Sequence, residues 1–169
     1  MKPDATGRLS QKHVATALHR VRGMSHPERL SVFETIYEKQ PNLLASVLVQ
    51  RKFGASYEKI EVLTELLLIC WEAMRESGET WPLISEEIQE RMLGRLVAHM
   101  KFREGLPPTY GDVAIAQWVE AHAEKWLLGA ALLKLQEQGL EQVESEADKF
   151  VVLAALNMVE CVAHAQHDA

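Results

Sequence analysis

Residues 60–74, IEVLTELLLICWEAM, determine the fold class that we expect for this chain of 169 residues. Apolar residues recur in this segment at alternating spacings of three and four, which is the period of an α-helix. Five more apolar residues between Leu66 and Ala73 extend the apolar surface almost all the way around the helix. Such a helix has to be buried on most of its sides, so the rest of the chain is expected to pack around it.

Start and stop signals predict further helices on both sides of this segment. Ser25 and Glu28 form a capping-box pattern with Pro27 in the first turn, and Gly78 and Gly139 are typical of helix ends. The expected helices cover residues 9–22, 25–40, 42–52, 56–77, 85–103, 112–138 and 141–165. No segment alternates polar and apolar residues for long enough to predict a strand. The sequence therefore predicts an all-α, single-domain bundle of six or seven helices.

Four of these helices are long, and short connections between them favour antiparallel neighbours. They are expected to start near Ser56, Ser85, Asp112 and Glu141 and to form a four-helix antiparallel core within residues 56–165. Residues 1–24 are expected to form a basic N-terminal arm. The whole chain, residues 1–169, is expected to be one domain.

The composition is typical of a globular protein with a sizeable core, since 47% of the residues are hydrophobic. The N-terminus lacks the apolar run of a secretion signal, and no run reaches the roughly 20 apolar residues of a membrane span. Cys70 and Cys161 lie in apolar runs, so both thiols are expected to be reduced and packed. We therefore expect a cytoplasmic protein without membrane contact.

Charge is distributed unevenly along the chain. The formal net charge is -6, yet residues 1–29 hold six Lys or Arg and only two acidic residues. Lys12, Arg20 and Arg22 are the candidate partner-binding residues of the N-terminal arm. One interpretation docks them on the acidic stripe of the central helix, and the other brings them to a phosphate backbone or an acidic protein. Because the apolar stripe of this arm is narrow, it is expected to be the least stably packed helix.

Two charged stripes run along neighbouring helices. Glutamates at helical spacing follow the central helix, and basic residues spaced by four follow the next helix. The first stripe contains Glu58, Glu61, Glu65, Glu72 and Glu76, and the second contains Arg91, Arg95, His99 and Arg103. We expect solvated faces rather than pairing between the two stripes, because exposed ion pairs contribute only about 0–1 kcal/mol.

Motifs with a specific chemistry are absent from the sequence, and we predict no catalytic residue. The chain has no Glu-x-x-His, His-Glu-x-x-His, phosphate-binding glycine loop or Gly-x-Ser-x-Gly. Glu120, His122 and Glu124 resemble a site, but residues two apart diverge on a continuous helix, so we discount the triplet. A ligand pocket inside the bundle remains an alternative, with the 104–112 loop at its rim. Its candidate residues are His99, Tyr110, Trp118, His122 and Trp126.

The densest group of potential metal ligands lies near the C-terminus. Glu160, Cys161, His164 and His167 combine a carboxylate, a thiol and two imidazoles, which together could satisfy a tetrahedral zinc ion. Fraying of the chain end argues against an ordered site. We therefore expect no cofactor, and zinc bound by these residues is the alternative.

Strong helical patterning without a catalytic set favours a non-catalytic helical interaction module, an adapter or an oligomeric scaffold. The alternatives are an enzyme or sensor that binds a small molecule or metal inside the bundle, and a nucleic-acid-associated regulator that uses the basic arm. Residues 150–159, FVVLAALNMV, are apolar on nearly every side and have to be covered. We therefore expect a homodimer formed partly through the last helix, in which the lone Asn157 can fix register or partner number. The alternative is that the seven helices cover this run within one chain.

Overall fold

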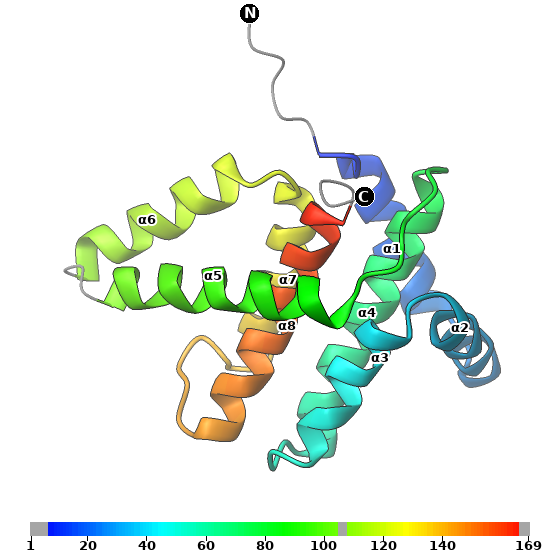
Figure 1. Cartoon of the computed structure of the whole chain (residues 1–169), viewed down its shortest axis with the longest axis horizontal. Helices are drawn as coiled ribbons and strands as arrows, with labels where there is room; N and C mark the ends of the chain where they lie inside the picture. The colour runs from blue at the N-terminus through cyan, green and yellow to red at the C-terminus, as the bar shows by residue number, and fades with distance from the viewer. Residues whose placement is uncertain (1–6, 105–107, 166–169) are drawn as a thin grey trace, which may run out of the picture.

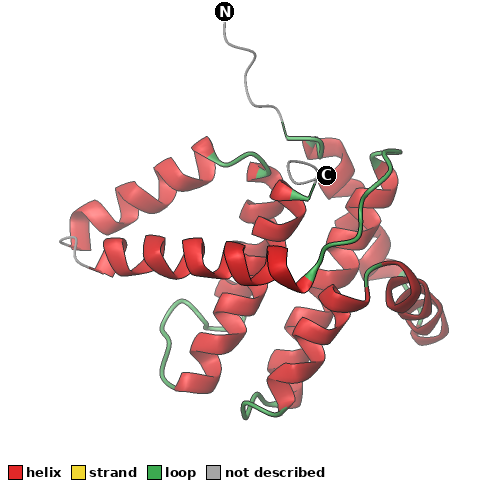
Figure 2. Ribbon diagram, in the orientation of Figure 1, coloured by secondary structure: helices red, strands yellow, loops and turns green. Residues whose placement is uncertain are grey.

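The computed structural model describes residues 7–104 and 108–165, and the side chains of residues 102–112 lie outside this description. This part of the chain contains eight α-helices, one short 3-10 helix and no strand (Figure 2). The elements are α1 (Gln11–Gly23), α2 (His26–Lys39), α3 (Pro41–Leu48), η1 (Val49–Arg51), α4 (Tyr57–Glu76), α5 (Glu86–Glu104), α6 (Pro108–Ala121), α7 (Lys125–Glu137) and α8 (Glu146–His164). The predicted all-α class is confirmed, and the elements form a single compact domain.

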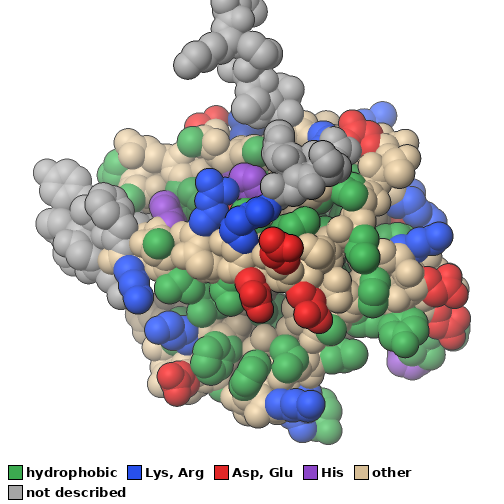
Figure 3. Space-filling model, viewed as in Figure 1, with side chains coloured by type: hydrophobic (Ala, Val, Ile, Leu, Met, Phe, Trp, Pro, Cys, Tyr) green, Lys and Arg blue, Asp and Glu red, His purple; other side chains and the backbone are tan. Residues whose placement is uncertain are grey.

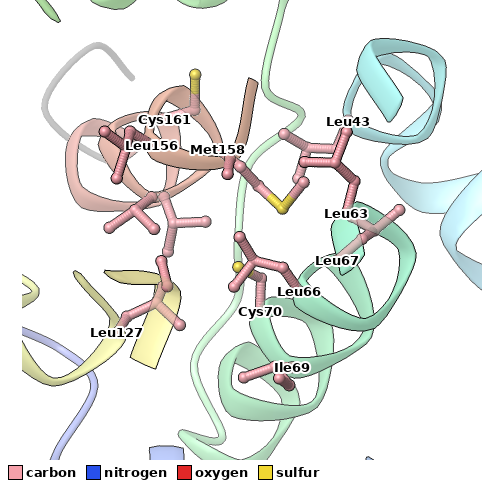
Figure 4. Close-up of a cluster of buried hydrophobic side chains, with 14 of the residues drawn as sticks. Leu43, Leu63, Leu66, Leu67, Ile69, Cys70, Leu127, Leu156, Met158 and Cys161 are labelled. Atoms are coloured by element: carbon pink, nitrogen blue, oxygen red, sulfur yellow. The ribbon is translucent and has the colours of Figure 1, made fainter. Parts of the chain in front are cut away.

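Helix α4 is the centre of the core, as residues 60–74 predict. Leu66 to Cys70 are all buried, and Figure 4 shows Leu66 lying toward Met158 of α8. Leu43 of α3 closes the same cluster, and each of these side chains is at most 2% exposed. Helices α1, α2, α3, α7 and α8 all contact α4. The central helix is therefore wrapped from several directions, as its all-round apolar surface requires.

Helix α1 packs differently from the sequence-based expectation of a loosely held arm. Its most extensive partner is α4, and Val14, Ala17 and Val21 are buried in the contact. Ser10 caps the helix and accepts the backbone N–H of His13, whose side chain accepts the Ser10 N–H in return. The small side chain of Ala17 lets α1 approach α4 closely. The narrow apolar stripe of α1 is therefore sufficient for an extensive contact with α4.

The acidic stripe of α4 has ion-pair partners on α1, α2 and α7. Glu72 is only 1% exposed, and it accepts Arg20 of α1 at 3.0 Å and Arg75 at 3.2 Å. Glu65 forms two ion pairs: its Oε2 lies 3.0 Å from Nζ of Lys134 on α7, and its Oε1 lies 3.7 Å from Nη2 of Arg29 on α2. The expectation of a fully solvated stripe is therefore wrong for Glu72, because α1 covers it and supplies its counter-charge.

One predicted helix is divided in two. Residues 112–138 were expected to be continuous, but α6 ends at Ala121 and α7 begins at Lys125. The described chain therefore has eight α-helices rather than six or seven. The division comes from side chains at the break that bind backbone groups, as the next subsection describes.

The four-helix antiparallel core is not confirmed. Helix α5 lies across α8 in Figure 1, while α1 packs along α4 in the place expected for a core neighbour. Helix α6 makes its main contacts with α5 and α7 and projects from the body of the molecule (Figure 1). The last helix also begins later than Glu141, at Glu146, because Ser145 caps it by accepting the backbone N–H of Asp148.

No helix in the described ranges is both long and apolar enough to cross a membrane.

Shortening a central α4 side chain tests this architecture. Leu67 is 1% exposed, so Leu67→Ala should leave a cavity and lower the free energy of unfolding by about 2–5 kcal/mol. Leu30→Ala on α2 is the matched control, since Leu30 is 52% exposed and its loss should cost less than about 1 kcal/mol. Urea unfolding followed by circular dichroism measures both. Equal losses in the two variants would contradict the central placement of α4.

Candidate functional site

Five of the side chains singled out in the sequence come together where α5, α6 and α8 meet. We call the set of His99, Trp118, His122, Glu160 and His164 the histidine–glutamate cluster. His99 comes from α5, Trp118 from α6, His122 from the end of α6, and Glu160 and His164 from α8. The ring centroids of His99 and Trp118 are 4.9 Å apart, and Trp118 meets His122 edge-on at 6.1 Å. The sequence thus identified the members of this cluster, but assigned them to two separate sites.

His122 has both ring nitrogens engaged. Its Nδ1 accepts the backbone N–H of Glu124 at 3.0 Å, and its Nε2 lies 2.6 Å from Oε1 of Glu160. Because Nδ1 accepts a hydrogen bond, the proton of the neutral ring is on Nε2, which donates to Glu160. A general base needs a nitrogen that is open to the substrate. This arrangement therefore orients α6 on α8 and leaves His122 without a nitrogen for catalysis.

Glu124 is the second polar side chain that shapes the break between α6 and α7. Its carboxylate is buried and accepts two backbone N–H groups, from Arg8 at 2.8 Å and from Leu9 at 3.3 Å. Gly7 lies against the same place, where a Cβ atom would be 1.9 Å from the carbonyl oxygen of Ala123. The N-terminal segment before α1 therefore crosses the break and depends on glycine at position 7 for its close approach.

Two members of the discounted triplet, His122 and Glu124, do interact with each other. The argument that His122 and Glu124 diverge holds only for a continuous helix, and the helix ends at Ala121. Glu120, the third member, is exposed and pairs with Lys125 at 3.2 Å. The triplet is not a catalytic set, but two of its three members fix the local backbone.

A small cavity of about 220 Å³ adjoins the histidine–glutamate cluster. Arg95 and Leu96 of α5 line it together with His99, Trp118, Glu160 and His164. Nε2 of His164 lies 3.7 Å from Oε2 of Glu160, so the carboxylate faces two histidines. The cavity is smaller than the roughly 300–1,000 Å³ of pockets that hold drug-sized ligands.

The structure does not gather the residues considered for zinc. Glu160 and His164 line the small cavity, whereas Cys161 lines a separate groove on the other side of α8. Burial raises the pKa of the Cys161 thiol to about 12, which disfavours the thiolate that zinc requires. In the part of the chain that the structure describes, no group of three or more His, Cys, Asp or Glu is placed to hold a metal ion. His167 lies outside the described residues.

Both cysteines are free and buried, as the sequence predicts. Burial also raises the pKa of the Cys70 thiol well above its usual range.

The two tryptophans considered for one ligand pocket are on different sides of the α6–α7 break. Trp118 belongs to the histidine–glutamate cluster, whereas Trp126 is 41% exposed and lines a shallow hollow of about 380 Å³ beside α1. The side chain of Tyr110 lies outside the described residues. The predicted ligand set therefore does not converge on one pocket among the described side chains.

Of the candidate partner-binding residues, only Arg20 has a described ion pair. Its guanidinium contacts Glu72 and Glu76 on α4, and the hydrogen bond to Glu72 raises its pKa. Lys12 and Arg22 are exposed on α1. Arg20 thus follows the interpretation in which the arm docks on its own central helix.

A further groove among the described residues was not identified from the sequence. It is a groove of about 730 Å³ between α3, α5 and α8, called here the α3–α5–α8 groove. Its walls include Val49 and Phe53 on one side and Leu93 and Val97 on the other, and α8 supplies the floor. Its lining residues are Asn42, Leu43, Ala45, Ser46, Val49, Gln50, Phe53, Glu86, Gln89, Glu90, Leu93, Val97, Phe150, Leu153, Ala154, Asn157, Met158 and Cys161.

The floor of the groove is the part of α8 that the fold leaves uncovered. The sequence shows that residues 150–159 are apolar on nearly every side, and the fold buries most of them. Phe150 remains 36% exposed, and Ala154 and Asn157 are half-buried. The signal for this surface was therefore present in the sequence, but its location required the placement of α5 and α3.

Comparison of the chain with protein-family models, with curated proteins and with solved structures gives no match. The function has to be argued from the geometry of the chain itself.

Removing the two hydrogen bonds of His122 should destabilise the segment between α6 and α7. His122→Phe keeps a ring beside Trp118 but leaves the Glu124 N–H and the Glu160 carboxylate without this partner. We expect the free energy of unfolding to fall by about 1–3 kcal/mol, and amide exchange at Glu124 to accelerate. His19→Phe on the exposed face of α1 is the control, and a similar loss there would show that the effect is not specific to the break.

The Glu124 carboxyl should make stability depend on pH. Burial raises its pKa above the ordinary 4.5, although the N–H donors of Arg8 and Leu9 oppose the shift. Between 4.5 and the raised value the folded state holds a proton that the unfolded state has lost. The contribution of Glu124 to stability is therefore largest in acid and falls as the pH rises through the folded-state pKa.

This dependence can be isolated by comparison with Glu124→Gln. The excess stability of the parent over the variant should shrink between pH 4.5 and pH 7, as measured by urea unfolding. Glu141→Gln, at an exposed position, is the control. An excess that stays constant or grows with pH would contradict the burial effect on Glu124.

Proposed function

We propose that this protein is a non-catalytic helical interaction module that docks the apolar face of a helix of a protein partner in the α3–α5–α8 groove. The observation that supports this function is the groove itself, which has a volume of about 730 Å³. Its three walls are helices, and an amphipathic helix laid into a groove between helices is a common mode of peptide recognition.

The exposed apolar side chains around the groove support docking. Phe53, Leu93 and Phe150 are 51%, 37% and 36% exposed, although each is a large apolar residue. The Phe53 and Phe150 rings lie 5.2 Å apart and form one end of the groove. Figure 3 shows hydrophobic side chains gathered between α5, the lower part of α8 and α3. Clustered exposure of this kind is typical of interaction sites.

The lining of the groove favours binding over catalysis. It contains no histidine, lysine or arginine, and the pKa of its thiol, Cys161, is raised by burial. The hydroxyl of Ser46 donates to the carbonyl oxygen of Leu43 at 2.6 Å, so it is held by a backbone acceptor rather than by a base. The lining therefore has no nucleophile paired with a histidine base of the kind that commonly activates it. The histidine–glutamate cluster supports the enzyme alternative less well, because both nitrogens of His122 are engaged and the adjoining cavity is small.

The nucleic-acid alternative rests on the basic N-terminal arm and receives less support than the groove. Arg20 is held by two glutamates of α4, which reduces the charge that α1 offers to a phosphate backbone. Duplex DNA binding at low salt remains the direct measurement for this alternative.

A homodimer remains a prediction. A second copy is one source of an apolar surface that would cover Phe53, Leu93 and Phe150. Light scattering over a wide range of concentration tests it, and a monomer throughout would leave the groove to a different partner.

Filling the groove should abolish docking. The probe is a fluorescein-labelled helical peptide with a leucine face and glutamine at its other positions, and its binding is followed by fluorescence anisotropy. We expect it to bind the parent protein, and Ala154→Arg to weaken binding by about tenfold or more, because the long side chain occupies the floor of the groove.

Ala116→Arg is the matched control, since Ala116 is exposed on α6 and lies outside the groove. It should leave peptide binding unchanged. Peptide binding that is absent from the parent, or that survives Ala154→Arg, would refute the proposed function.

A further inference from the structure

We infer, on the basis of the proposed function, that the helix docked in the α3–α5–α8 groove is basic. Its lysine or arginine side chains pair with Glu86 and Glu90 and donate hydrogen bonds to the side-chain oxygens of Gln50 and Asn157. Two independent features of the groove carry this inference: the charge of its lining and the orientation of two amide groups.

The charged residues that line the groove are all acidic. Glu86 and Glu90 lie one turn apart on α5 and both face the groove, and no Lys, Arg or His belongs to its lining. Figure 3 shows acidic side chains over the first part of α5, beside the hydrophobic side chains of the groove. Lys52 and Lys149 are exposed next to Phe53 and Phe150 in sequence, but they do not line the groove. The potential inside the groove therefore favours a cation.

The two amides present oxygen atoms that no described protein group satisfies. Oε1 of Gln50 and Oδ1 of Asn157 are buried and have no hydrogen-bond partner among the described residues. Gln50 as a whole is only 7% exposed. A buried acceptor without a donor costs roughly 1–3 kcal/mol, so two of them along one groove require an explanation.

The orientation of each amide is fixed by its nitrogen. Nε2 of Gln50 donates to the carbonyl oxygen of Ser46 at 3.2 Å, and Nδ2 of Asn157 donates to that of Gln89 at 3.0 Å. Rotating either amide by half a turn would set its oxygen against a carbonyl oxygen. Both residues line the groove, so each fixed amide leaves an acceptor there that only a donor can satisfy.

A basic side chain fulfils both requirements. The backbone N–H groups of a docked helix are used within that helix, except in its first turn, so its side chains must supply the donors. The ammonium group of lysine carries three N–H donors and the guanidinium group of arginine five, and neither has an acceptor. Asn157 is bonded to α5 at Gln89 and lines the groove with Glu90, so the same wall holds an amide oxygen and a carboxylate.

Three peptides with the same leucine face test the inference, with lysine, glutamine or glutamate at their other positions. We expect the lysine peptide to bind at least tenfold more tightly than the glutamate peptide, with the glutamine peptide between them. The difference should shrink as the salt concentration rises, because Glu86 and Glu90 are exposed and their charges are screened. Equal affinities would overturn the inference and leave the proposed function intact, whereas no binding by any peptide would overturn both.

Two sets of variants distinguish the contribution of the Glu86 and Glu90 charges to peptide binding from that of the Gln50 and Asn157 oxygens. Glu86→Gln combined with Glu90→Gln should remove most of the preference for lysine. Glu87→Gln combined with Glu58→Gln makes the same change of charge at exposed positions outside the lining and should keep the preference. Loss of the preference in both double variants would show that the net charge, and not the groove, selects the peptide.

Gln50→Met and Asn157→Leu each replace a buried acceptor by an apolar side chain of similar size. Each should weaken binding of the lysine peptide about fivefold or more, because the acceptor for its donor is lost. Each substitution also removes the hydrogen bond that the amide nitrogen donates to a helix carbonyl oxygen, so the loss of that bond and the loss of the unpaired acceptor should offset each other and the melting temperature should change only slightly. Because the two substitutions are made separately, misfolding of one variant leaves the other as a test. Unchanged affinity in a folded variant of each kind would refute the donor-bearing ligand.

Discussion

The burial of α4 is the constraint on which the other elements depend. A helix with apolar side chains around most of its circumference has to be surrounded, and each buried Leu or Ile side chain contributes about 1.5–3 kcal/mol when it leaves water. Helices α1, α3, α7 and α8 provide the surround, and Glu72 is the polar exception within it. Its pairing with Arg20 compensates a buried carboxylate and, for that reason, fixes the position of α1 more than it adds stability.

The second determinant is the break between α6 and α7, where hydrogen bonds compete successfully with helix continuation. Nδ1 of His122 accepts the backbone N–H of Glu124, which a continuous helix would have paired, and the Glu124 carboxylate accepts two backbone N–H groups from the N-terminal segment. Ending α6 there lets it turn away from the body and pack on α5 (Figure 1). The break therefore both closes the histidine–glutamate cluster and releases α7 to pack against α4 and α8.

The sequence predicts those features that are encoded within a few residues. The capping box at Ser25 and Glu28 and the glycines that close α4 and α7 lie where local chemistry places them, with Gly78 and Gly139 both at positive φ. The α6–α7 break could not be predicted in this way, because neither glycine nor proline marks it. The local bond between His122 and the Glu124 N–H is joined there by contacts of the Glu124 carboxylate with residues more than a hundred positions earlier in the chain.

The same distinction between local and long-range information applies to the candidate sites. Periodicity identified His99, Trp118, His122, Glu160 and His164 as residues to consider, but it could not show that they form one cluster or that both nitrogens of His122 are engaged. It also showed that residues 150–159 need cover, without showing which part of them the fold leaves open.

The groove follows from the direction of α5. A helix laid alongside α8 would cover the row from Phe150 through Ala154 to Asn157, whereas α5 crosses α8 (Figure 1) and α3 reaches only part of the remainder. An interior that served stability alone would fill this space with apolar side chains. Here it contains two amides whose oxygens no described protein group satisfies, beside two carboxylates. Such arrangements lower the stability of the isolated protein and are typical of surfaces that are completed by a binding partner.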